Sequence, residues 1–174
     1  MKNRPSKISL LSGCLLAVFA FNFVIYALES DKQQGIQFSS DGGSTMSTTG
    51  ALRTLEMHTN VKVTQGSMQI SGDAAIFEYQ AASNDLNRVT VHGTPVQYQQ
   101  QLDETGRTVK GTGDTLLLYT DTSTGDTVLE LIGNAIITTP DSSMKCASIV
   151  YLADQNIIRD APGPCEGVFN SPTN

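Results

Sequence analysis

The sequence contains no tryptophan, only 6% aromatic residues and only two histidines. Outside the N-terminus, no stretch shows a sustained apolar period of 3.6 residues, which argues against long amphipathic helices. Serine, threonine, glycine and glutamine are frequent instead, and they favour strands and turns. The 174 residues, 39% of them hydrophobic, are enough for one domain with its own core. We therefore predict a single all-β domain.

Groups that could form an enzyme site are scarce as well. His58 and His92 both stand beside predicted turns, and there is no G-x-S-x-G nucleophile motif. The sequence "TGDT" occurs at 112–115 and 124–127, but in the wrong order for an aspartic protease, and hairpin turns account for Gly-Asp in both places. The glycine-rich stretch 39–44 precedes no helix, so it predicts no phosphate site. The sequence thus predicts no enzyme, no cofactor and no metal site.

The N-terminal residues differ from the rest of the chain. Three basic residues, Lys2, Arg4 and Lys7, precede an apolar run that extends from Ile8 to Leu28. This order is typical of a secretory signal peptide, with small residues suited to cleavage at Ala20 or Ala27. We expect residues 1–27 to be a signal peptide. An uncleaved N-terminal anchor is the alternative, because the run is about 20 residues long.

Positive charge is the second scarcity. The chain has 11 Lys and Arg against 17 Asp and Glu, and removal of residues 1–27 would leave 8 against 17, a net charge of −9. A protein that binds nucleic acid or an anionic membrane surface usually presents a basic patch. The negative net charge therefore argues against both as partners. An anionic ligand would have to be held by apolar contacts.

Two cysteines remain outside the N-terminal segment, Cys146 and Cys165. In an exported protein an even pair is more often bridged than free, and no C-x-x-C or His partner suggests zinc. Cys146 falls in a predicted strand and Cys165 in the proline-rich segment 161–174, which we expect to be a loose tail. A bridge would tie this tail to the domain at 28–160.

Short alternating runs punctuated by Gly, Asn, Asp and Pro predict about 14–16 short strands. One sequence pattern recurs at 60–79, 94–119 and 134–151. It consists of a strand, a turn, a second strand and a longer run that ends in tyrosine. Such a unit cannot bury its apolar face alone, so we expect the units to stack. The first and last strands of the stack, near 35–40 and 156–160, carry few blocking charges and should be open to pairing.

Five segments resemble the LptA/OstA family of lipopolysaccharide-transport proteins. In order, they are "QQGIQFSSD" at 33–41, "VKVTQGSMQISGDAAIFEY" at 61–79, "GTPVQYQQ" at 93–100, "VKGTGDTLLLY" at 109–119 and "LIGNAIIT" at 131–138. The resemblance covers roughly residues 33–158. It implies an OstA-type β-jellyroll, a V-shaped groove of stacked antiparallel strands, in a periplasmic protein without chemistry of its own.

The resemblance also implies a ligand and partners. The ligand is lipopolysaccharide, held by its lipid A acyl chains. The partners are an LptC-like protein at the inner membrane, an LptD-like protein at the outer membrane, and further copies of the chain stacked head to tail into a bridge. Two alternatives remain open: an LptC-like component that keeps its N-terminal anchor, and a structural β-solenoid or adhesin-like surface module.

Candidate lipid-contacting residues come from two sources. Alternation places three pairs each on one strand face: Ile36 with Phe38, Val61 with Val63, and Met68 with Ile70. The family resemblance adds Tyr98 and Leu131, and it also supports Ile36.

Overall fold

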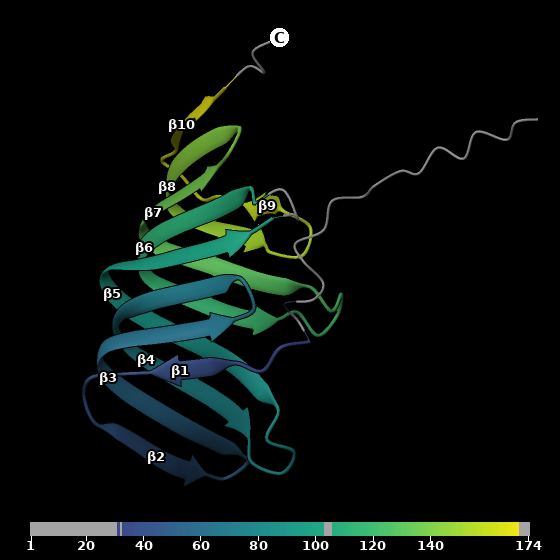
Figure 1. Ribbon diagram of the computed structural model, residues 1–174. Coiled ribbons are helices and arrows are strands. Elements are labelled where there is room, and N and C mark those ends of the chain that lie inside the picture. The colour runs from purple at the N-terminus through teal and green to yellow at the C-terminus, as the bar shows by residue number, and fades with distance from the viewer. Residues whose placement is uncertain (1–30, 32, 103–105, 171–174) are drawn as a thin grey trace, which may run out of the picture.

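The computed structural model describes residues 31, 33–102 and 106–170, and most of them belong to one antiparallel sheet. The strand order is β1-β3-β4-β5-β6-β7-β8-β10, with β2 also paired to β3 and β9 also paired to β8. Figure 1 shows the strands stacked one above another, from β2 at the bottom to β10 at the top. Within the described residues, no helix has the length and apolarity needed to cross a membrane. The prediction of an all-β jellyroll is confirmed.

Six long strands form the body of the sheet, and four short strands form its edges. The long strands are β3 (Leu52–Gln65), β4 (Met68–Gln80), β5 (Leu86–Gln101), β6 (Thr108–Thr120), β7 (Thr127–Thr139) and β8 (Ser142–Leu152). The short ones are β1 (Gln37–Ser39), β2 (Ser44–Thr49), β9 (Ile157–Asp160) and β10 (Glu166–Phe169).

Each pairing between neighbouring long strands is interrupted near its middle, and the β4–β5 pairing has a second irregularity between Glu78 and Tyr79. The central register shifts lie between His58 and Val61, Ser71 and Ala74, His92 and Val96, Thr112 and Thr115, and Ile132 and Ala135. Irregularities of this kind bend a strand and increase its twist. Because they coincide across the sheet, the whole sheet folds along one line.

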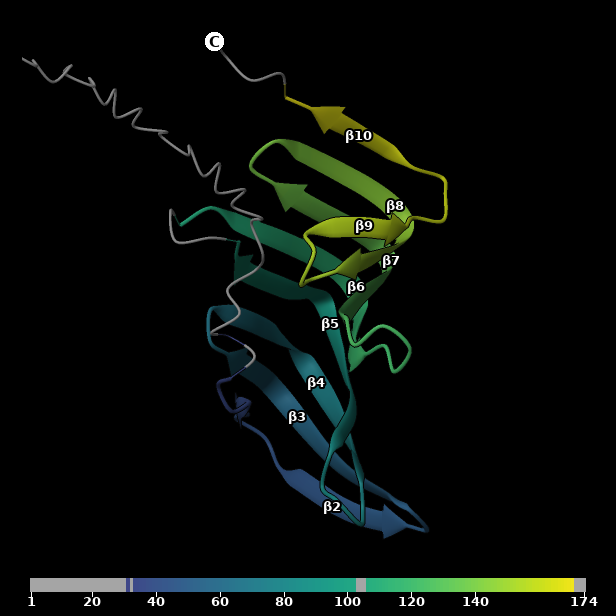
Figure 2. The same cartoon turned by 90° about the vertical axis from the view of Figure 1, so that its right-hand side faces the viewer.

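This fold line divides the sheet into two arms. The β1 arm contains the strand segments between β1 and β10, such as Val61–Gln65 and Ser142–Cys146. The β2 arm contains the segments between β2 and β9, such as Leu52–His58 and Ser148–Leu152. Figure 2 shows the stack from the side, with β2 and β10 at opposite ends.

The fold line explains why more and shorter strands were predicted. Sequence breaks near residues 59, 73, 93, 113 and 133 mark bends within continuous strands instead of strand ends. The interpretation of "TGDT" at 112–115 as a hairpin turn was therefore wrong, since Thr112–Thr115 lies in mid-strand in β6. The second copy does lie at a turn, because residues 124–126 belong to the loop between β6 and β7 and Thr127 begins β7.

The repeated sequence pattern at 60–79, 94–119 and 134–151 is related to these bends. Each copy starts at a bend, turns in the β1 arm and returns along the next strand into the β2 arm. At each start, the side chain of an Asn or Thr donates to an aspartate: Asn60 to Asp41 (2.9 Å), Thr94 to Asp73 (2.6 Å) and Asn134 to Asp114 (3.1 Å). The repeat is thus a unit of structure, built on one aspartate contact at each bend.

A glycine is required at two of these bends. A Cβ at Gly72 would lie 2.6 Å from the carbonyl oxygen of His92, because neighbouring strands approach closely there. Gly133 has φ of +74°, a conformation that side chains with a Cβ rarely adopt. The recurrence of glycine beside the bends therefore has a steric cause.

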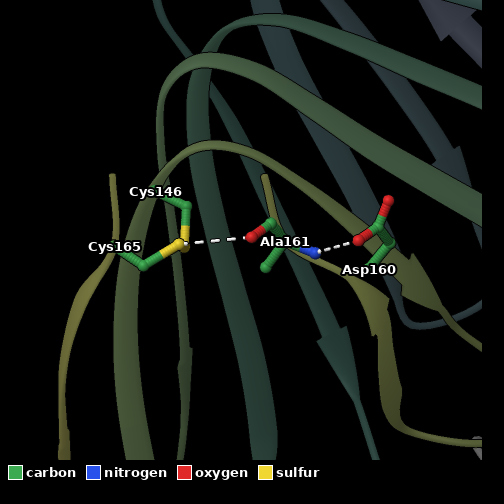
Figure 3. Close-up of a disulfide and its surroundings, with 4 residues drawn as sticks. All are labelled: Cys146, Asp160, Ala161 and Cys165. Atoms are coloured by element: carbon green, nitrogen blue, oxygen red, sulfur yellow. Dashed lines mark hydrogen bonds between the residues drawn. A yellow bond between two sulfur atoms is a disulfide. The ribbon is translucent and has the colours of Figure 1, made fainter. Parts of the chain in front are cut away.

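The predicted disulfide is present in the structure, and it fastens β10 to the sheet. Cys146, in β8, is bonded to Cys165, immediately before β10, and their Cα atoms are 4.2 Å apart (Figure 3). The proline-rich segment contains β10, which pairs with Ser142–Lys145, so the expectation of a loose tail is wrong for residues 166–169. That strand was missed because Pro162, Pro164 and Gly163 dominate the local composition.

We predict that Cys146→Ser/Cys165→Ser releases β10 and leaves the core folded. All four residues of β10 are exposed, so apart from the disulfide there are few apolar contacts to hold this strand against β8. Closing a loop of this size stabilises by about 3 kcal/mol in the chain-entropy account. Hydrogen exchange should therefore accelerate at residues 166–169 and stay slow at Val89 and Leu116. Unchanged protection of β10 would show that strand pairing alone holds it.

Candidate functional site

The space between the two arms is lined by rows of apolar side chains that cross the sheet from edge to edge. In the β1 arm, the backbone register aligns Phe38, Val63, Ile70, Tyr98, Gly111, Ile137, Met144 and Gly167. In the β2 arm, it aligns Met46, Leu55, Phe77, Val89, Leu118, Leu129, Tyr151 and Ile158. We call these the inner rows. Each contains one residue from every strand of its arm.

The arms contact one another through these rows. The rings of Phe38 in the β1 arm and Phe77 in the β2 arm have centroids 5.2 Å apart. Farther along the stack, a Cβ on Gly111 would lie 2.9 Å from a methyl group of Leu131 in the opposite arm. The lack of a side chain at Gly111 thus lets Leu131 approach the β1 arm beside Tyr98.

The structure brings most of the predicted lipid-contacting residues together. Phe38, Val63, Ile70 and Tyr98 are four successive members of one inner row. Val61, Met68 and Leu131 belong to the same buried cluster, and Ile36 is partly buried against it. Their role in binding stays a prediction, but their common location is a finding.

The exposure of side chains in the inner rows, and of inward-facing side chains beside them, changes from the middle of the stack to its ends. Tyr98 and Leu131 are 2% and 0% exposed, so the arms are closed on one another in the middle. At the N-terminal edge, Phe38 and Met46 are 47% and 60% exposed. At the C-terminal edge, Ile158 is only partly buried, and Phe169 is 80% exposed. The apolar interior therefore reaches both ends of the stack.

In the described part of the chain, the two buried residues with charged or amide side chains are Asp31 and Gln100. The sequence analysis did not predict their burial. The carboxylate of Asp31 accepts hydrogen bonds from the Ser67 amide (2.9 Å), the Ser67 hydroxyl (2.5 Å) and the Gln100 side chain (3.3 Å). Gln100 in turn accepts from the Tyr98 hydroxyl (2.6 Å). This chain links the N-terminal segment to the interior of the β1 arm. Nothing in the local pattern around Asp31 signals burial, because its partners are 36 and 69 residues away.

The interior tyrosines are neutral hydrogen-bond donors. Burial raises the pKa of Tyr98 well above its usual value, and nearby Tyr151, Asp31 and Asp154 act in the same direction. Burial likewise raises the pKa of Tyr151, whose hydroxyl donates to Asn156 (2.7 Å). Neither ring therefore places a charge between the arms at physiological pH.

No catalytic arrangement emerges in residues 31, 33–102 and 106–170. Within these ranges, no three His, Cys, Asp or Glu side chains are grouped to hold a metal ion. His58 and His92 both lie exposed at the fold line, and the His92 ring lies 3.0 Å from the Thr115 hydroxyl. The geometry instead offers an apolar interior open at both ends.

These features define a class: an open, folded β-jellyroll whose apolar interior runs through a stack of strands. The family model for "LptA/(LptD N-terminal domain) LPS transport protein" matches residues 44–157, and the chain belongs to this family. No curated protein matches the sequence closely enough to count as a relative.

A solved structure agrees with the fold. It is LptH of Pseudomonas aeruginosa, described as the LptA homologous periplasmic component of the conserved lipopolysaccharide transport device. It superposes with a TM-score of 0.67 at 20% identity, over 82% of this chain and 99% of that one. The fold predicted from the resemblance is thereby confirmed.

Proposed function

We propose that the protein is a periplasmic, lipopolysaccharide-binding component of a bridge between the inner and outer membranes. The observation that carries this proposal is the pair of inner rows, apolar from one edge of the stack to the other and exposed at both ends. Family membership supplies the ligand class. Lipid A acyl chains would lie between the arms, and the sugars would remain outside.

Binding requires the arms to part. Tyr98 and Leu131 have almost no exposure in the closed structure, so an acyl chain must separate the rows to reach them. Strands β3 to β8 pass from one arm to the other at the fold line, so these strands do not cross the opposite side. We infer that a chain enters from that opposite side.

The bridge also requires partners at both ends of the stack. β1 and β2 form the N-terminal edge, and β9 and β10 form the C-terminal edge. Strand addition at these edges would join this chain to copies of itself, to an LptC-like partner at one end and to an LptD-like partner at the other. The inner rows would then continue from one domain into the next.

Photo-crosslinking tests the groove. With a crosslinking residue at Ile36, Tyr98 or Leu131, we expect capture of lipopolysaccharide in the periplasm, since all three face the space between the arms. Glu56 is the matched control, because it lies on the outer face of the β2 arm and is exposed. Equal capture at Glu56 and Leu131 would show that contact is unspecific, and no capture at any inner position would overturn the proposal.

A further inference from the structure

Charge is distributed unevenly over the outside of the folded sheet. The three lysines among the described residues, Lys62, Lys110 and Lys145, all belong to the β1 arm. Each alternates with inner-row neighbours, so all three point outward. The outer face of the β2 arm instead carries Glu56, Glu78 and Glu130, and its Arg88 is ion-paired with Glu78 (2.6 Å). The two outer faces therefore differ in sign.

Two outer rows can be followed across the β1 arm by backbone register. One is Ser39, Lys62, Ser71, Gln97, Thr112, Ile136, Lys145 and Glu166. The other is Gln37, Thr64, Gln69, Gln99, Lys110, Thr138, Ser143 and Val168. From β1 to β8, these rows contain no Asp or Glu. The one acid, Glu166 on β10, lies 3.5 Å from the Lys145 ammonium group.

The outer face is hollowed over β3 to β6. Eight polar residues line this depression: Lys62, Thr64, Gln69, Ser71, Gln97, Gln99, Lys110 and Thr112. Ile70, Tyr98 and Gly111 also border it, but they belong to the inner row, and the Ile70 and Tyr98 side chains are buried. Lys62 and Lys110 stand at diagonally opposite corners of it. Neither forms an ion pair with another residue in the described part of the chain. We call this depression the outer basin.

The side chains of the outer basin select a class of ligand. Ammonium groups donate to anionic oxygens, and glutamine amides and threonine hydroxyls both donate and accept. The basin's aromatic and aliphatic lining residues, Tyr98 and Ile70, are each only 2% exposed, so they offer little anchor for a lipid chain or for a protein hot spot. A long polyanion such as nucleic acid would extend beyond the basin and be repelled by the rest of the chain, whose net charge is −6. A short, hydroxyl-rich anion fits best.

We propose that the outer basin binds the phosphorylated oligosaccharide of the same glycolipid whose acyl chains lie between the arms. This inference rests on the proposed function for the source of the sugar, and on the basin itself for the site. A segment of about five residues in the β1 arm is only about 17 Å long. An oligosaccharide that leaves the interior opposite the fold line can therefore reach round the arm to Lys62 and Lys110.

The test uses a probe without acyl chains, the deacylated phosphorylated oligosaccharide obtained from lipopolysaccharide by alkaline hydrolysis. It is titrated into the oxidised full-length mature protein and followed by NMR. We expect the backbone and side-chain amide signals of Gln69, Gln97 and Gln99 to shift. Lys62→Gln/Lys110→Gln should weaken binding about tenfold, since it removes both ammonium groups that would pair with the phosphates. Binding should also weaken as salt is raised.

The control variant, Arg53→Gln/Arg159→Gln, removes the same charge from the β2 arm and its neighbouring edge. It should bind as the wild type does. Equal weakening in both variants, equal binding of a dephosphorylated oligosaccharide, or saturation by inorganic phosphate at the same concentration would each overturn the proposal. Because the probe has no acyl chain, these outcomes do not depend on capture at Leu131, which tests the groove separately.

Discussion

Phe77→Ala should destabilise the protein by about 3–5 kcal/mol, the usual cost of deleting a buried phenylalanine ring. Phe77 is fully buried in the inner row of the β2 arm. Its ring lies 5.2 Å from Phe38 across the interior and 6.4 Å from Tyr79 along its own strand. The alanine would leave a cavity where Phe77 contacts Phe38 of the opposite arm. Urea unfolding, monitored on dilute oxidised protein, measures the change.

Phe38→Ala is the matched control, because it removes the other ring of the same contact. Phe38 is 47% exposed, so its loss should cost roughly half as much or less. Dilute protein is needed because self-association would stabilise the folded state by mass action. If both variants lose the same free energy, the exposed edge is more tightly packed than the structure indicates.

Local sequence patterns predicted the side-chain faces well. Val61 and Val63, and Met68 and Ile70, share faces because a strand alternates with a period of two, whatever its partner. The same patterns could not distinguish a bend from a strand end. Gly72-Asp73 and Gly113-Asp114 carry the composition of a turn, yet their strands continue because the neighbouring strand bends at the same height.

Features that depend on distant partners were beyond the local pattern. β10 forms because the Cys146–Cys165 bridge brings residues 166–169 beside β8. Asp31 is buried because Ser67 and Gln100 satisfy its carboxylate. The outer basin needed the strand register, since Lys62 and Lys110 are 48 positions apart in the sequence and become neighbours only through β4 and β5.

The structure also changes the expected geometry of stacking. The two edges predicted from sequence, near 35–40 and 156–160, became β1 and β9, which lie in different arms. They cannot face one another in a simple head-to-tail stack. Each arm has a second edge strand at the other end of the stack, so β1 would meet β10 of the next copy, and β2 would meet β9. This arrangement would also place exposed Phe38 and Met46 near Phe169 and Ile158 of the neighbour.

Proline substitutions at the C-terminal edge should therefore weaken self-association when placed in one arm and prevent it when placed in both arms. Wild-type protein should show a mass that rises with concentration in light scattering, because unlike edges give an interface that does not close. Ile157→Pro affects the β2 arm and Val168→Pro affects the β1 arm. Each should raise the concentration needed for association by at least roughly tenfold, since proline removes a backbone donor and disfavours strand addition.

The double variant, Ile157→Pro/Val168→Pro, should remain monomeric, because neither arm would then offer an unmodified edge. Ile157→Thr and Val168→Thr are the matched controls, since threonine keeps the backbone donor and favours strands. They should associate nearly as the wild type does if backbone pairing dominates the junction. Association of the double proline variant at wild-type concentrations would contradict pairing through β9 and β10. A loss confined to Ile157→Pro would instead show that the β2 arm alone carries the contact, and that the disulfide-fastened β10 takes no part in it.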